Sequence, residues 1–273
     1  MIVRLACIGY MCAALIGCGH ARREEVLNAG SQSMGEPATR ETRALREYFE
    51  LAQEQPAWFR NPDAADPVGY EILLNRGDID AAEAARAGEL QRQNYPPEWA
   101  QVGVVFEDQY LRVLRDAVRK PGRRLGTYIR IVAPANGGIG VAILPLWDDK
   151  VVLVDHHRHA TRERHLEMPR GFGEPGTSWE DNARRELQEE IGANPIQVVD
   201  LGYLHTNTGI SSERVQLVFA RIQSLGGPEQ AEGIAAIVTL SIAQLEDRIA
   251  GGIITDSFTI AAYARARLRG FLP

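Results

Sequence analysis

Cysteine is confined to one end of this sequence. The chain has three cysteines, Cys7, Cys12 and Cys18, and all of them lie within the first 18 residues. Residues 19–273 therefore form no disulfide among themselves and offer neither a thiol nucleophile nor a thiolate ligand for a metal.

Long apolar runs and an excess of positive charge are also missing. The apolar run within residues 1–18 is too short to span a bilayer comfortably. A net charge of −6 and a pI near 5.6 argue against nucleic acid as the main partner. Small phosphorylated ligands remain possible, because a metal can bridge them. With 273 residues, of which 45% are hydrophobic and 24% charged, the chain can bury one good-sized core and a smaller module.

The first 18 residues are typical of a secretory signal, because a single Arg precedes the apolar run. The segment Leu15–Cys18 resembles a bacterial lipobox, which implies a lipid anchor at Cys18 and a cell-envelope protein tethered by residues 19–36. The alternative is an over-extended gene start, with the chain beginning near Met34 in the cytoplasm.

A linker and a helical extension are expected over residues 19–100. Apolar residues at helical spacing predict an amphipathic helix over 39–55 and an Ala-rich helix over 79–93, with Asp78 as the cap of the second. Nothing in this extension indicates a chemistry.

From residue 101 the pattern changes to strands, with a main domain from 136 onward. Strands are predicted at 104–106, 111–118, 127–132, 141–146, 151–154, 198–204, 214–222 and 234–240. Helices are predicted at 242–250 and 257–269, the second capped by Asp256.

One further helix, over 178–191, carries the acidic residues of interest. Ser178 is a suitable N-cap and Gly192 a stop signal. Glu186, Glu189 and Glu190 share one face because they are three and four positions apart. Like charges in this arrangement destabilise a helix, and a bound cation relieves them. Oxygen ligands favour Mg²⁺ or Mn²⁺ over Zn²⁺. A solvated acidic face is the alternative.

The spacing of Gly171, Arg185–Leu187, Glu189–Glu190 and Gly192 resembles the Nudix box, Gly-x5-Glu-x7-Arg-Glu-U-x-Glu-Glu-x-Gly-U with U aliphatic. Six fixed residues at these offsets arise by chance on the order of 10⁻⁷ times per starting position.

Two positions depart from the box. Ala193 stands for a larger aliphatic residue, and Thr177 stands for the first Glu. In the family that Glu mostly supports the box arginine. Thr177 therefore leaves the support of Arg185 open, with Glu174 or Glu180 as possible substitutes.

Residues 166–171, LEMPRG, are similar to the Trp-Glu-Leu-Pro-Ala-Gly turn of the ADP-ribose pyrophosphatase branch. The resemblance implies that Arg158 contacts the diphosphate, Glu167 lines the site and the carbonyl of Arg170 is a metal ligand. Glu167 has an alternative role as an ion-pair partner of Arg162 or Arg164.

Two neighbouring segments have candidate roles of their own. The histidines at 156, 157 and 159 are a weaker candidate for a zinc site, because adjacent strand residues point to opposite faces. In the loop 224–233, the resemblance implies that Glu229 or Glu232 is the general base, and solvated loop carboxylates are the alternative.

Taken from residue 102 to the end of the sequence, the resemblance implies an α/β/α sandwich with a mixed sheet, the Nudix fold, preceded by the helical N-terminal extension. Strands at 101–135 would help to form a homodimer. The implied activity is hydrolysis of a nucleoside diphosphate linked to a group X, with ADP-ribose or a nucleotide sugar first. Glu186, Glu189 and Glu190 would hold one to three Mg²⁺ ions. The alternatives are a Nudix domain that senses a nucleotide without cleaving it and a structural lipoprotein with an idle box.

Overall fold

The computed structural model describes residues 42–63, 68–132 and 138–272. The candidate signal, Cys18 and Met34 lie outside these ranges, as do the first three residues of the expected 39–55 helix. Within the described ranges, no helix combines the length and apolar character that a bilayer crossing requires.

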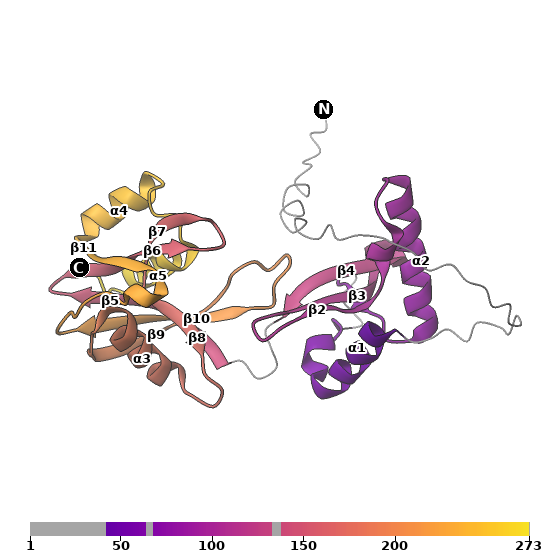
Figure 1. The fold of residues 1–273 in the computed structure, drawn as a ribbon, viewed down its shortest axis with the longest axis horizontal. Helices are drawn as coiled ribbons and strands as arrows, with labels where there is room; N and C mark the ends of the chain where they lie inside the picture. Colours follow the sequence, from indigo (N-terminus) through magenta and orange to yellow (C-terminus); the bar gives the residue numbers. More distant parts are fainter. Residues whose placement is uncertain (1–41, 64–67, 133–137, 273) are drawn as a thin grey trace, which may run out of the picture. The chain divides into compact units, whose positions relative to one another are not determined.

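The N-terminal module, residues 42–132, consists of two helices and a four-stranded antiparallel sheet (Figure 1). Strand β3 lies between β1 and β2 and also pairs with β4. The elements are α1 (Arg43–Glu54), β1 (Glu71–Ile72), α2 (Arg76–Arg92), β2 (Gly103–Glu107), β3 (Arg112–Lys120) and β4 (Arg124–Val132).

Both expected helices of this module are present, and one cap differs. Thr42 caps α1 by accepting a hydrogen bond from the Leu45 main-chain N–H. Helix α2 begins three residues before the expected start, because Asn75 caps it through bonds from Gly77 and Asp78. The prediction that Asp78 is the cap was wrong. Asp78 lies in the first turn, where its charge favours the positive end of the helix dipole.

The C-terminal module, residues 138–272, contains a seven-stranded mixed sheet. Its central order is β11-β6-β5-β10-β9, with β7 paired to β6 and β8 paired to β5. Strands β5 and β10 are parallel, and the other pairs are antiparallel. The strands are β5 (Gly138–Trp147), β6 (Lys150–Arg158), β7 (Glu163–Glu167), β8 (Arg170–Gly173), β9 (Pro195–His205), β10 (Arg214–Ile222) and β11 (Ile234–Leu240).

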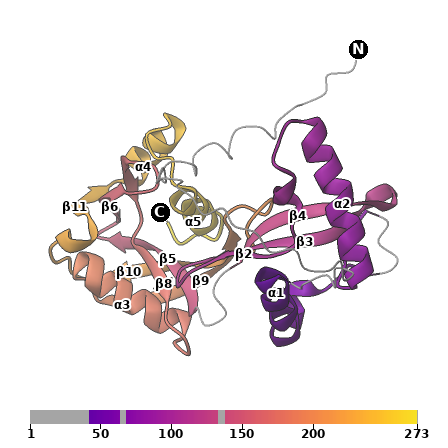
Figure 2. The same ribbon diagram turned by 45° about the vertical axis from the view of Figure 1, so that its right-hand side comes forward.

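Helices cover both faces of this sheet (Figures 1 and 2). Helix α3 (Trp179–Ile191) packs on one face, and α4 (Ile242–Ala250) and α5 (Ser257–Leu268) pack on the other. Successive residues of β5 divide between these two cores: Ile143 belongs to the core under α3 and Leu144 to the core under α5. The expected α/β/α sandwich with a mixed sheet is confirmed.

Candidate active site

Helix α3 is held at both ends by local interactions. The Ser178 hydroxyl accepts a hydrogen bond of 3.1 Å from the main-chain N–H of Asp181. At the other end, Gly192 adopts φ 61°, and a side chain there would meet the Cα of Gly226 at 2.8 Å. The cap and stop signals read from the sequence are confirmed, and they set the register of the acidic face.

Two of the three carboxylates on that face are buried. Glu190 is 2% exposed and Glu186 is also buried, whereas the Glu189 side chain is half exposed. Burial raises the pKa of Glu190 to about 8, and the negative charge of Glu186 adds to this effect. Burial likewise raises the pKa of Glu186. The charge of Glu232 raises the pKa of both groups further, so negative charge converges here from two elements.

Gly171 makes room for this arrangement. A Cβ atom at this position would lie 2.1 Å from the carboxyl carbon of Glu186. The carboxylate of Glu186 thus packs directly against the main chain of β8, and any larger residue at 171 would displace it. A glycine at 171 thus lets the Glu186 carboxylate keep this position against β8.

Arg170, the first residue of β8, bonds to α3, to Glu167 and to Asp256 at the start of α5. The Arg170 main-chain N–H donates to the Glu190 carboxylate over 3.2 Å. The Arg170 guanidinium donates to Glu167 over 3.1 Å and to Asp256 over 2.8 Å. The sequence suggested no role for Asp256 beyond capping α5, which it does by accepting from the Thr259 main-chain N–H. Its bond to Arg170 is an additional finding.

Glu167 is 1% exposed and lies between two arginines. The Arg158 Nε donates to it over 2.6 Å, and Arg170 donates to its other oxygen. The alternative partners considered from the sequence bond elsewhere: Arg164 pairs with Asp155, and Arg162 contacts His159. Glu167 therefore connects Arg158 at the end of β6 with the turn before β8.

His156 and His157 fall on opposite sides of β6, as the strand period requires. His156 is buried, with Nδ1 3.3 Å from Glu167, and His157 is exposed. Burial lowers the pKa of His156 to about 4, and the nearby charges of Arg158 and Arg170 lower it further. This imidazole is therefore neutral at physiological pH.

Arg185 binds the acidic face itself. Its guanidinium lies 2.7 Å from Glu186 and 2.8 Å from Glu189, and it donates to the Phe172 carbonyl over 3.1 Å. Of the two substitutes suggested for the missing first Glu, Glu174 lies 3.7 Å from the Arg185 Nε, too far for a hydrogen bond, and its side chain is exposed.

The loop 224–233 is hydrogen-bonded to the carboxyl end of α3. Main-chain N–H groups of Gly226 and Glu229 donate to the carbonyls of Ile191 and Glu190, over 2.9 and 3.2 Å. The short helix Gln230–Glu232 then brings the charge of Glu232 close enough to act on Glu186 and Glu190. Of the two candidate bases, Glu232 has this electrostatic link to the acidic pair.

Asn182 is a buried polar residue that the sequence reading did not single out. It is fully buried on α3, four positions before Glu186, and neither amide atom has a hydrogen-bond partner among the described residues. The sequence contained a signal for Asn182, because an amide four positions before a motif glutamate falls on the same helix face.

The donor set suits a hard divalent cation. Buried carboxylates with raised pKa values are relieved by a cation, and their oxygens match Mg²⁺ or Mn²⁺. Among the described residues, no group of three or more histidine, cysteine or acidic side chains is arranged so that it could hold a metal ion. Arg185 contacts one oxygen of Glu186 and one of Glu189, so each carboxylate keeps a second oxygen that could coordinate an ion.

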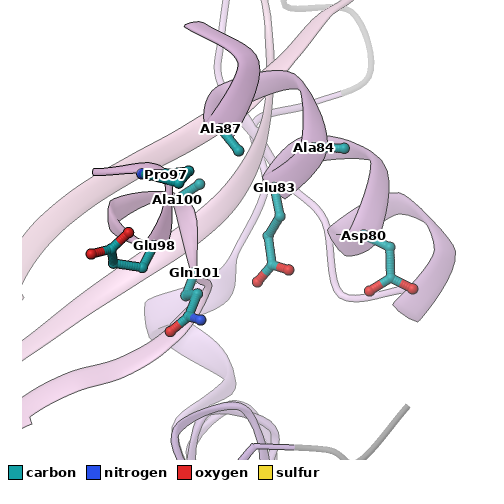
Figure 3. A pocket seen from close by; sticks show the side chains of 8 residues that line it. All are labelled: Asp80, Glu83, Ala84, Ala87, Pro97, Glu98, Ala100 and Gln101. Carbon is teal, nitrogen blue, oxygen red and sulfur yellow. The ribbon is translucent and has the colours of Figure 1, made fainter. Parts of the chain in front are cut away.

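A second pocket with acidic side chains lies in the N-terminal module, between α2 and the short helix Pro97–Ala100 (Figure 3). The carboxylates of Asp80, Glu83 and Glu98 line it and point in different directions. Asp80 pairs with Arg76, and Glu83 accepts from the Val102 main-chain N–H. These contacts give the two residues structural roles.

Comparison with known proteins agrees with the site. The model of the NUDIX domain family matches residues 138–253. An ADP-ribose pyrophosphatase of Mycobacterium tuberculosis is 32% identical over 157 residues, which cover 54% of this chain and 72% of that protein. The chain belongs to the Nudix family.

A second relative and a solved structure are also similar to this chain. ADP compounds hydrolase NudE of Escherichia coli is 32% identical over 93 residues, covering 34% of this chain and 48% of that protein. A crystal structure of an ADP compounds hydrolase has the same fold, with a TM-score of 0.54, 24% identity, and coverage of 63% of this chain and 93% of that one. The chain is a Nudix hydrolase of the ADP-ribose pyrophosphatase-like branch.

Proposed function

We propose that this Nudix protein hydrolyses a nucleoside diphosphate linked to a group X, with ADP-ribose as the first candidate and a nucleotide sugar as the next. The products are a nucleoside monophosphate and a phosphorylated remainder. The main support for the proposal is a pair of buried glutamates, Glu186 and Glu190, on one face of α3. Burial raises the pKa values of both. The relatives named for ADP-ribose and ADP compounds support the substrate class.

Glu186, Glu189 and Glu190 would hold Mg²⁺ or Mn²⁺, together with the main-chain carbonyl of Arg170. When bound, such ions offset phosphate charge and make a water a better nucleophile. The protein keeps Glu190 in place through the Arg170 N–H and packs Glu186 against Gly171. These contacts orient the carboxylates before any ion arrives.

Arg158 is the proposed ligand of the substrate diphosphate. Glu167 fixes its guanidinium through Nε. An arginine side chain has five N–H donors, so a guanidinium held in this way retains donors for phosphate oxygens. The role of Glu167 is then to line the site and to orient Arg158.

Glu232 is the proposed general base, and Glu229 is the second candidate. Glu232 is exposed and its charge acts on Glu186 and Glu190, so it could accept a proton from an attacking water and release it to solvent. Glu229 is joined to α3 through its main chain. Separate Glu232→Gln and Glu229→Gln variants distinguish the two, because loss of the base lowers kcat.

The function is tested by incubating wild type with ADP-ribose, related dinucleotides and nucleotide sugars in Mg²⁺, and by measuring release of the nucleoside monophosphate. Glu190→Gln is the matched inactive variant. Equal turnover by the two proteins would reject the proposed site.

A nucleotide sensor is the alternative function. Thr177 in the box and the long helical extension motivate it, whereas the intact Arg185–Glu186 and Glu189–Glu190 pairs of the box argue against it. Binding of a dinucleotide without product release, across the same panel, would support the sensor. Failure to bind Mn²⁺ at all would instead indicate a structural protein with an idle box.

We also retain the proposal that the N-terminal strands contribute to a homodimer. Phe106 of β2 is 51% exposed and Ile129 of β4 is 39% exposed, and a second copy would cover them. Light scattering of wild type and of a Phe106→Glu variant tests this, since the charge would disrupt a dimer that uses this strand.

A further inference from the structure

The beginning of α5 is bonded to the turn that leads into β8, although the two segments are far apart in sequence. One oxygen of Asp256 accepts from the Arg170 guanidinium over 2.8 Å, and the other accepts from the Thr259 N–H and hydroxyl over 2.8 and 2.7 Å. The Thr259 hydroxyl oxygen accepts in turn from the Met168 N–H over 3.0 Å. Asp256 is buried along its side chain, so solvent competes little for these bonds.

The Arg170 side chain is fixed on three sides. Asp256 and Glu167 each take one of its terminal nitrogens, and the guanidinium lies 4.9 Å from the ring centre of Phe258. The main-chain N–H of the same residue donates to Glu190. A fixed side chain therefore fixes the main-chain group that contacts the most buried glutamate of the site.

We propose that Asp256, through Arg170, is a positioning residue for the acidic pair. It holds the main chain at 170 against Glu190, so that this carboxylate stays in the orientation that a divalent cation needs. This inference rests on the proposed function of the acidic face as a cation site. The simpler role of Asp256 is to cap α5, and the two roles can be separated because they use different oxygens.

Asp256→Asn separates them. Asparagine is as good an N-cap as aspartate, and its single oxygen is needed by the Thr259 N–H. Its NH₂ group then faces the Arg170 guanidinium, which places a donor against a donor. Mn²⁺ binding to the protein without substrate, measured by electron paramagnetic resonance, is expected to weaken about 10-fold, as is typical when a residue that orients a metal ligand is lost. Turnover of ADP-ribose is expected to fall at limiting Mn²⁺ and to recover at saturating Mn²⁺.

Ser241→Ala is the matched control. Ser241 caps α4 in the same module by accepting from the Gln244 N–H over 3.2 Å. Its loss is expected to lower the melting temperature and to leave Mn²⁺ affinity unchanged. Arg170→Lys is the second variant: it keeps the charge but loses the planar fork that bridges Asp256 and Glu167, so Mn²⁺ binding is again expected to weaken.

Wild-type Mn²⁺ affinity in Asp256→Asn, or in Arg170→Lys if the first variant fails to fold, would overturn the inference. Equal weakening in Ser241→Ala would overturn it as well, since any cap loss would then have the same effect. If wild type releases no product from any substrate but the variants still differ in Mn²⁺ affinity, the proposed function fails and the positioning role stands.

Discussion

Asp116 in the N-terminal module and Glu190 in the C-terminal module are buried to the same degree, at 2% exposure each. Asp116 accepts from the Tyr48 hydroxyl over 2.6 Å and from two nitrogens of Arg130 over 2.6 and 3.1 Å. Glu190 accepts from a main-chain N–H and has the charge of Glu186 beside it. The two carboxylates are therefore equally buried, but Asp116 is next to a positive charge and Glu190 is next to a negative one.

This difference distinguishes a structural carboxylate from a functional one. A buried ion pair whose oxygens are satisfied holds its surroundings in one arrangement, and Asp116 joins α1 to β3 and β4 in this way. A buried carboxylate next to another carboxylate is destabilising until a proton or a cation arrives. A bound cation would therefore stabilise the ionised form of Glu190, whereas Arg130 already stabilises the ionised form of Asp116.

The largest expected effect comes from removing the charge of Glu190. Glu190→Gln should lower turnover of ADP-ribose on the order of 10³-fold, because a cation ligand and its electrostatic contribution to the transition state are lost. The cation-free variant should be at least as stable as wild type, since it no longer has a buried carboxyl group whose ionisation beside Glu186 is unfavourable. Product release and thermal melting of both proteins check this, and a clear loss of stability would show that Glu190 is paired as Asp116 is.

Removing Asp116 should have the reverse pattern. Asp116→Ala leaves the partly buried Arg130 and the buried Tyr48 hydroxyl without their shared partner, which costs about 3–5 kcal/mol of unfolding free energy. The activity of the folded fraction should remain close to wild type. Urea denaturation gives the free energy, and a loss below about 1 kcal/mol would contradict the structural role.

The stability of the cation-free protein should also depend on pH through Glu190. The pKa of Glu190 is about 8 in the native state and near the ordinary 4.5 in the unfolded chain. Between these values the native state holds a proton that the unfolded state has released, so the stability of the cation-free protein falls as pH rises from about 4.5 to about 8. Thermal melting across this window is the measurement.

Glu190→Gln is the control for the pH series, because it removes the group whose pKa differs between the states. The slope should become shallower in this variant, and an unchanged slope would assign the effect to another residue, such as Glu186, whose pKa burial also raises. Adding Mn²⁺ to the wild-type protein near pH 8 should restore the stability that it loses as the pH rises, since the cation replaces the proton.

The sequence predicted the elements whose signals are local. Strands β10 and β11 and helix α4 have the expected bounds, because apolar runs and caps mark them. Strands β7 and β8 were not predicted, because they are short and contain charged residues, and their pairing with β6 and β5 depends on the tertiary fold. The start of α2 was misplaced because Asn75 and Asp78 are both good caps.

At the site, the acidic face could be read directly from spacing, because a helix brings residues three and four apart together. The partners of Arg170 could not be read in this way. Asp256 is 86 residues away, and its capping signal explains its presence without reference to any arginine. Glu167 had nearby arginines in sequence, but the strand turn sets which of them it meets.

The smallest expected effect concerns Asn182, a third buried polar side chain, which has neither the partners of Asp116 nor the charge of Glu190. A buried amide without hydrogen bonds costs about 1–3 kcal/mol, and alanine is also the better helix former. Asn182→Ala should therefore stabilise the cation-free protein by about 1 kcal/mol after the small cavity is counted. Leu187→Ala on the same helix is the control, with an expected loss of about 2–5 kcal/mol. If Asn182→Ala is destabilising instead, the amide has a partner in solution, and Asn182 then belongs with Asp116 among the satisfied groups.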